Sequence, residues 1–167
     1  GRKVVVFSQW RRMLHLAHWA VTDLLAESKL RAGFFTGAEK QRRRTQNIVE
    51  FHDDPDFRIL YASDAGGVGL NLQRAANCVI NLELPWNPED YVHRVGRTGR
   101  AGATGDAISL VCVDEADLLR GVQRLLQTAI PWEVAEGFEP SREEPRPLRT
   151  PRGAGGATFG GSSRGRS

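Results

Sequence analysis

Five short apolar runs alternate with stretches of helical periodicity along this 167-residue chain, and this alternation constrains the fold more than any other feature. The expected strands span 4–7, 32–36, 58–63, 78–84 and 106–113. They are rich in apolar residues and lack clean polar alternation, which is typical of parallel strands with both faces buried. The pattern therefore predicts an α/β fold, in which a parallel sheet carries helices on both faces.

Helices are expected between the strands, at residues 11–27 and 39–52, from Pro88 to the glycines at 99 and 102, and at 115–128. Asn87 has the side chain of an N-cap, and Pro88 suits the first helical position. Ligands of open parallel sheets bind beyond the carboxyl ends of the strands. The loops that follow the first four strands are therefore expected to form the functional edge.

The charge of the chain is uneven. The formal net charge is +3, yet residues 141–167 hold six arginines against two glutamates, so the rest of the chain is slightly acidic. This last segment is rich in Arg, Gly, Pro and Ser and poor in core-forming residues, which predicts a disordered tail after one folded domain at residues 1–140. Its arginines and Phe159 suit single-stranded nucleic acid, and a plain solubilising tail is the alternative.

Cysteine and histidine usage argues against a metal site. Cys78 and Cys112 each lie in an apolar run, which predicts buried free thiols in a reducing, cytoplasmic compartment. His15 and His18 have no carboxylate or cysteine cluster nearby in sequence and are interpreted as surface or packing residues. No apolar run approaches the length of a membrane span, so no membrane association is expected. The chain starts directly before its first strand, which suggests a domain cut from a longer protein.

A run of arginines lies between Tyr91 and Arg100, at i, i+3 and i+6, with glycines at 96 and 99 between them. Planar, permanently charged guanidinium groups suit phosphate oxygens, although three arginines alone are more typical of a solvated basic face. The whole pattern, His-Arg-x-Gly-Arg-x-Gly-Arg, resembles motif VI of superfamily 2 helicases in its DEAD-box form. That motif belongs to the second RecA-like lobe of those enzymes.

The resemblance implies roles for four residues of this motif. Arg97 and Arg100 would reach ATP bound on the first lobe and act as catalytic arginine fingers. His93 and Arg94 would couple the ATP cleft to the nucleic-acid side, and Arg94 is also placed among the nucleic-acid contacts.

Residues 63–72 contain three glycines that would let backbone N–H groups approach a phosphate closely. The stretch resembles motif V of the same helicases. The resemblance implies that Ser63, Gly67 and Gly69 contact the nucleic-acid backbone, while Gly69 and Asn71 lie at the bound nucleotide.

Some residues depart from the DEAD-box form. Val68 and Asn71 stand where that form has arginine and aspartate. The stretch Gly66–Leu72, like Phe7–Trp10 and Pro85–Pro88, looks instead like Swi/Snf-type DNA translocases.

Two further elements are expected to contact the nucleic-acid strand. Ser8 follows the first strand, within the stretch that looks like Swi/Snf proteins. Gln41 and Arg44 resemble the Gln-x-x-Arg element of the DEAD-box family, which helps to place the nucleic-acid strand.

From Gln41 to about Pro140 the chain resembles the second lobe of DEAD-box RNA helicases, and the RhlE subfamily fits best. This implies a single RecA-like lobe whose partners are RNA, single-stranded or in a short duplex, and an amino-terminal RecA-like lobe that holds ATP and Mg²⁺. These 167 residues contain no Gly-x-x-x-x-Gly-Lys-Ser/Thr loop, so the chain alone is expected to hydrolyse no ATP. A lobe of a Swi/Snf-type double-stranded DNA translocase and a non-catalytic nucleic-acid-binding module are the alternatives, and the oligomeric state is left open.

Residues 114–117 spell Asp-Glu-Ala-Asp after an apolar run, as a magnesium-binding motif would. They lie downstream of the motif VI stretch, where the family has no such motif. Asp114 is instead expected to cap the last helix, and Glu115 and Asp117 to complement the positive end of that helix.

Overall fold

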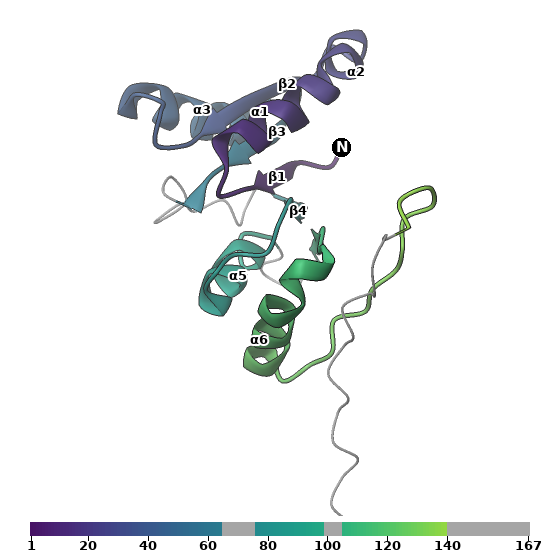
Figure 1. Ribbon diagram of the computed structural model, residues 1–167. Helices are drawn as coiled ribbons and strands as arrows, with labels where there is room; N and C mark the ends of the chain where they lie inside the picture. Colours follow the sequence, from purple (N-terminus) through teal and green to yellow (C-terminus); the bar gives the residue numbers. More distant parts are fainter. Residues whose placement is uncertain (65–75, 99–104, 140–167) are drawn as a thin grey trace, which may run out of the picture.

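The computed structural model describes residues 1–64, 76–98 and 105–139 (Figure 1). In chain order the elements are β1 (Val4–Phe7), α1 (Arg11–Ala20), α2 (Thr22–Glu27), β2 (Arg31–Phe35), α3 (Gln41–Asp53), β3 (Phe57–Ala62), β4 (Cys78–Asn81), α5 (Pro88–Val95), β5 (Asp106–Ser109), the short 3₁₀ helix η1 (Val113–Glu115) and α6 (Ala116–Leu126). The predicted tail lies outside the described residues.

The five strands form one sheet in the order β2-β3-β1-β4-β5, and every pairing between them is parallel. Phe7 at the end of β1 lies opposite Ala62 on β3 and Asn81 on β4. The carboxyl ends of the three central strands are therefore level and form one edge. The predicted parallel α/β sheet is confirmed.

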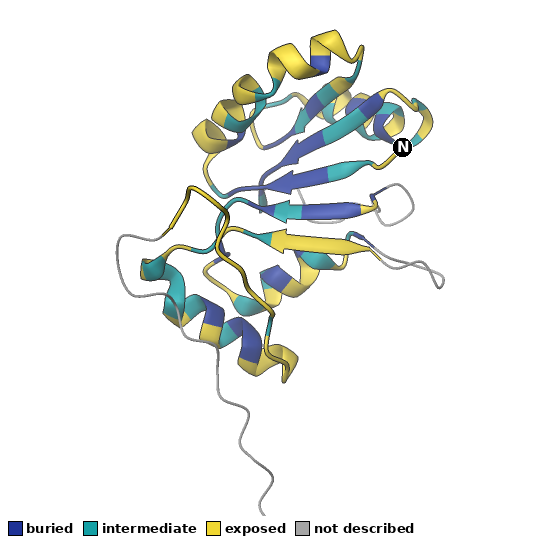
Figure 2. Cartoon of the chain, turned by 90° about the vertical axis from the view of Figure 1, so that its right-hand side faces the viewer, coloured by how far each residue is buried: buried dark blue, intermediate teal, exposed yellow. Residues whose placement is uncertain are grey.

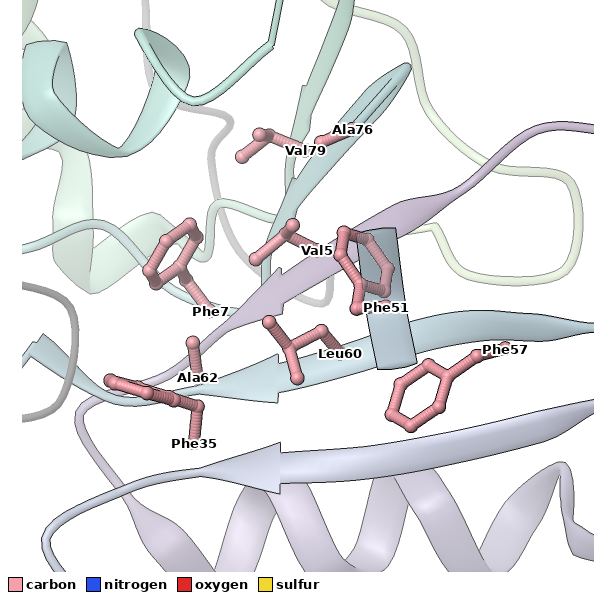
Figure 3. Packing of buried hydrophobic residues seen from close by; sticks show 9 residues of the cluster. All are labelled: Val5, Phe7, Phe35, Phe51, Phe57, Leu60, Ala62, Ala76 and Val79. Atoms are coloured by element: carbon pink, nitrogen blue, oxygen red, sulfur yellow. The ribbon is translucent and has the colours of Figure 1, made fainter. Parts of the chain in front are cut away.

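Successive residues of β1 point into cores on opposite faces of the sheet. Val5 and Phe7 pack in a cluster that includes Phe51 of α3 (Figure 3). Val6 packs with Leu14 of α1 on the other face. Burying such a side chain contributes roughly 1.5–3 kcal/mol, so the two cores hold the sheet between α1 and α3. A third cluster joins α5 and α6 through Leu84, Tyr91, Leu119 and Val122.

The single helix expected at 11–27 is two helices, because the chain breaks at Val21. Val21 has φ −113° and ψ 7°, outside the helical range, and its N–H donates to the carbonyl of His18 at 3.2 Å. The Thr22 hydroxyl donates to the same carbonyl at 2.9 Å. Val21 and Thr22 are both β-branched, which lowers their helix propensity. The Thr22 hydroxyl also competes with backbone N–H groups for the carbonyl of His18.

The expectation that the last strand is buried on both faces is wrong. Asp106 and Ala107 are exposed, and Ile108 is 51 % exposed, as the yellow strand at the lower edge of the sheet in Figure 2 shows. Within the described residues β5 pairs only with β4, and the cluster beneath α1 does not include it. Cys112 just beyond the strand is exposed as well, whereas Cys78 on β4 is buried as expected.

Lys3 ties the start of the chain to the end of α3. Its Nζ donates to the backbone carbonyls of Phe51 and Asp54, the second at 2.9 Å, and lies 5.4 Å from the centre of the Phe51 ring. These carbonyls have no partner inside the helix, so the ammonium group caps the helix end. Burial, followed by the nearby Arg58, lowers the pKa of Lys3.

Candidate nucleotide and nucleic-acid interface

The centre of the functional edge is a buried ion pair between Arg94 and Asp64. Arg94 lies on the last turn of α5, and its side chain is only 2 % exposed. Its Nε and Nη2 donate to the two carboxylate oxygens of Asp64 at 2.7 and 2.5 Å. Two parallel hydrogen bonds of this kind fix both the orientation and the distance of the partners. Asp64 lies two residues beyond the end of β3, so the pair fastens α5 to the loop that follows that strand.

The third guanidinium nitrogen of Arg94 reaches the end of β4. Nη1 donates to the backbone carbonyl of Glu83 at 3.2 Å and to Asn81 Oδ1 at 3.4 Å. The guanidinium carbon also lies 5.6 Å from the ring centre of Phe7 on β1. Arg94 therefore joins the ends of three strands inside the lobe. Its predicted contact with nucleic acid and its coupling role stay predictions.

Glu83 joins the loops that follow β1 and β4. One carboxylate oxygen accepts from the hydroxyl of Ser8 at 2.9 Å, and the other accepts from the N–H of Gln9 at 2.6 Å. Ser8 is completely buried, so in this structure its hydroxyl holds the loop. Ser63 at the end of β3 is buried too, and its N–H donates to the carbonyl of Phe35 at 3.2 Å. The predicted contacts of both serines with a nucleic-acid strand are not tested.

Gln41 and Arg44 lie together on the first turn of α3, beyond the end of β2. Arg44 Nη2 donates to Gln41 Oε1 at 2.5 Å, and the guanidinium carbon lies 5.7 Å from the ring centre of Phe35. Arg44 Nε is buried without a hydrogen-bond partner in the described part of the chain. The two residues are thus held in contact with each other, and their contact with a nucleic-acid strand remains a prediction.

His93 and Arg97 lie nearer the solvent than Arg94. The His93 side chain is 70 % exposed, with Nδ1 3.9 Å from Asp90 Oδ1. Arg97 is half-buried, and its Nε donates to the carbonyl of His93 at 3.1 Å. The arginine run therefore does not present one common face, because Arg94 is turned into the lobe. The other predicted site residues, Gly67, Gly69, Asn71 and Arg100, lie outside the described residues.

The paired histidines of α1 are packing residues. His15 stacks on Phe34 with 4.5 Å between ring centres, and His18 meets the edges of Phe34 and Tyr61 at 5.3 and 5.4 Å. Burial, with a smaller contribution from His15, lowers the pKa of His18. Burial also raises the pKa of Tyr61 to about 12.

The Asp-Glu-Ala-Asp stretch works through Glu115 rather than Asp114. Helix α6 begins at Ala116, so the residue before it is Glu115, and the predicted cap at Asp114 is wrong. The Glu115 carboxylate accepts from the N–H of Leu84 at 2.9 Å and of Cys112 at 3.0 Å. An intervening turn of 3₁₀ helix moves the start of α6, and Glu115 thereby ties the loop after β4 to the end of the sheet.

Sequence reasoning missed three polar residues of this edge, which are Asp64, Asn81 and Glu83. Each lies at or just after the end of a strand, where parallel sheets place their functional groups. Glu83 stands between two leucines, and an acidic residue in an apolar run is a signal that could have identified it.

A family model described as the helicase conserved C-terminal domain matches residues 1–102. The chain belongs to this family. The ATP-dependent RNA helicase RhlB of Aliivibrio fischeri is similar to this helicase lobe, with 38 % identity over 128 residues, which cover 77 % of this chain and 29 % of the relative. The lobe thus spans less than a third of that protein. The relative carries the name RhlB, not the RhlE name that the sequence suggested, while the assignment to helicases is confirmed.

Solved structures support the same family. An Escherichia coli DEAD-box protein, SrmB, solved with the regulator of ribonuclease activity A, matches with a TM-score of 0.71 and 27 % identity, over 87 % of this lobe and 82 % of that chain. A DEAD box protein from Methanococcus jannaschii matches with a TM-score of 0.64 and 35 % identity, over 76 % of this lobe and 33 % of that chain. The expected RecA-like lobe of DEAD-box helicases is therefore confirmed. No helix within the described ranges is long and apolar enough to cross a membrane.

Proposed function

We propose that this lobe is the carboxyl-terminal half of the motor of an ATP-dependent RNA helicase. The observation that carries the proposal is the different placement of the basic residues at the end of α5 and just beyond it. Arg94 fastens the helix to Asp64 and the strand ends, while Arg97 and His93 lie closer to solvent. A helix held by one arginine can present the next one in a fixed position to a second lobe.

The residues present fit the nucleotide that the family implies. Arg97 is held by its hydrogen bond to His93, which orients its guanidinium before ATP arrives. Bound ATP would supply the phosphoanhydride bond that is cleaved. Arg97, with Arg100, would stabilise the charge that develops at the γ-phosphate, an effect worth about 10³–10⁵ in rate for arginine fingers. The family resemblance assigns Mg²⁺, like ATP, mainly to the amino-terminal lobe.

The nucleic-acid strand would cross the carboxyl edge of the sheet. Gln41 and Arg44 are paired beyond β2, and Ser8 and Ser63 shape the loops beyond β1 and β3. Contacts of backbone amides and guanidinium groups with phosphates give binding without base readout and with strong salt dependence. Closure of the two lobes would bend the strand, and hydrolysis would release it, in a cytoplasmic setting.

The test mixes the chain with a separately produced amino-terminal DEAD-box lobe and measures ATP hydrolysis with single-stranded RNA or duplex DNA. We expect RNA-stimulated turnover that Arg97→Ala abolishes. Arg120→Ala, on the exposed side of α6, is the matched control and leaves turnover unchanged. Turnover by the chain alone that is lost in Arg97→Ala would contradict the proposal.

A second candidate is the double-stranded DNA translocase lobe, which the stretch Trp86-Asn87-Pro88 favours. Stimulation by duplex DNA and none by RNA would select it. Absence of stimulation by either would favour a non-catalytic binding module. Whether the lobe belongs with RhlB-like or RhlE-like enzymes is a finer question, and the RhlE assignment remains a proposal based on residues 88–94 and 109–115.

A further inference from the structure

Two large aromatic side chains on the functional edge have no role in the proposed function. Trp10 is 62 % exposed and Trp86 is 73 % exposed. Trp10 follows β1 and Trp86 follows β4, and these strands are adjacent, with Phe7 opposite Asn81 at their ends. Indole rings rank among the groups that gain most from burial, so two of them left in water on neighbouring loops indicate a surface for a ligand.

Hydrogen bonds fix the two loops to each other. The Gln9 side-chain amide donates to the carbonyl of Leu84 at 3.2 Å, and the Gln9 backbone N–H donates to the carboxylate of Glu83. The Trp10 N–H donates to the Ser8 hydroxyl at 3.0 Å, and the Trp10 carbonyl accepts from the N–H groups of Met13 and Leu14 in α1 at 2.9 and 3.2 Å. Both indoles therefore project from a common support.

Trp86 is anchored by its neighbours in sequence. Pro85 before it is buried, and Pro88 begins α5 two residues later. Proline rings restrict the backbone on both sides, so little backbone freedom would be lost when a ligand binds the indole. Neither Trp10 nor Trp86 takes part in a ring contact within the described residues, which leaves their faces available.

The charges around the two rings suit a polyanion at the Trp10 end. Arg11 and Arg12 follow Trp10 directly and are exposed, and the first turn of α1 holds no acidic residue. At the other end, Glu89 is exposed and Asp90 is half-buried in the first turn of α5. Phosphate contacts are therefore expected beside Trp10, and base contacts at both rings. Aromatic faces next to arginines are the combination that holds single-stranded nucleic acid.

We propose that Trp10 and Trp86 form a stacking platform for the bases of single-stranded nucleic acid, with Arg11 and Arg12 on the adjoining phosphates. The inference rests on the proposed function, which brings the sugar-phosphate backbone across the same edge, and adds contacts to the bases. Because every base has a π-face, the platform binds without regard to sequence.

The test compares two labelled strands of equal length and charge by fluorescence anisotropy, with the full 167-residue chain. One strand is oligouridine, and the other carries abasic ribose at its central positions. We expect the wild-type chain to bind oligouridine about fivefold or more tightly than the abasic strand. Trp10→Ala and Trp86→Ala should each lose about fivefold or more on oligouridine and nothing on the abasic strand, while Trp10→Phe keeps most of the affinity.

Trp19→Ala is the matched control, because Trp19 lies near the far end of α1 and is 74 % exposed. It should change neither affinity, and thermal unfolding should show all the variants folded. Equal binding of both strands by the wild-type chain would overturn the platform and leave backbone binding standing. An equal loss in Trp19→Ala would also overturn it, because the effect would then belong to apolar surface in general. Failure to bind either strand would overturn the platform and the nucleic-acid part of the proposed function together.

Discussion

Replacing Arg94 on α5 with alanine should destabilise the lobe far more than replacing Arg97, which follows the helix. The guanidinium group satisfies both carboxylate oxygens of Asp64 as well as the carbonyl of Glu83. Removing one partner of a buried ion pair costs about 3–5 kcal/mol, because the remaining charge loses its partner. The Asp64 side chain is 36 % exposed, so water can replace part of the lost interaction. We therefore expect a loss near the lower end, about 3 kcal/mol.

The assay is equilibrium unfolding in urea, followed by circular dichroism. Arg97→Ala is the control one turn away, and since Arg97 is only half-buried it should change the free energy of unfolding by about 0.5 kcal/mol or less. Asp64→Asn and the double variant complete a cycle, and the coupling between Arg94 and Asp64 should be at least about 1 kcal/mol. If Arg94→Ala and Arg97→Ala unfold at the same urea concentration, the reasoning about the buried pair is refuted.

Two further predictions concern stability. Lys3→Met removes the cap of α3 and should lower the free energy of unfolding in urea by about 1–2 kcal/mol, because charged hydrogen bonds are lost. Lys29→Met, at an exposed site, should cost almost nothing. Equal urea midpoints for the two variants would contradict the cap. Because burial lowers the pKa of His18 below its ordinary 6.5, the folded state binds its proton less readily than the unfolded state does. The free energy of unfolding should therefore be highest above about pH 7 and fall as the pH drops through 6.5. His18→Leu should flatten this pH dependence, while His93→Gln should not. A flat profile of the wild-type chain would refute the assignment.

The sequence predicts strands and helix starts well wherever the local signal is strong. Val4–Phe7 is a strand with the bounds expected, and α5 begins at Pro88, where a proline is favoured. The break at Val21 was missed because apolar spacing continues through it, without the glycine or proline that usually marks the end of a helix. The exposure of β5 was missed because an apolar run does not reveal whether another element covers it.

The candidate site shows the same division. The arginine run predicts guanidinium groups that suit phosphate oxygens, and the structure places that of Arg94 at the carboxyl edge of the sheet. Spacing cannot show which arginine faces the sheet, because that depends on the rotation of α5 set by Tyr91 and its neighbours in the third core cluster. Asp64 and Glu83 escaped prediction because their partners lie 30 and 75 residues away in sequence.

The exposed β5 strand bears on how this lobe behaves at high concentration. Among the described residues β5 pairs on one side only. Such a strand offers a row of backbone donors and acceptors to an extended peptide, including the same strand of another molecule. Asp106 opens the strand and pairs with Arg2 at 2.7 Å, which places charge at one end of this row. Further along, Ile108 and Leu110 are more than half exposed and carry no charge. Charge therefore opposes edge-to-edge association of molecules at the start of β5, and nothing comparable in the described part of the chain opposes it at the end of the strand. Ile108→Lys is accordingly the substitution on β5 that should improve colloidal stability most.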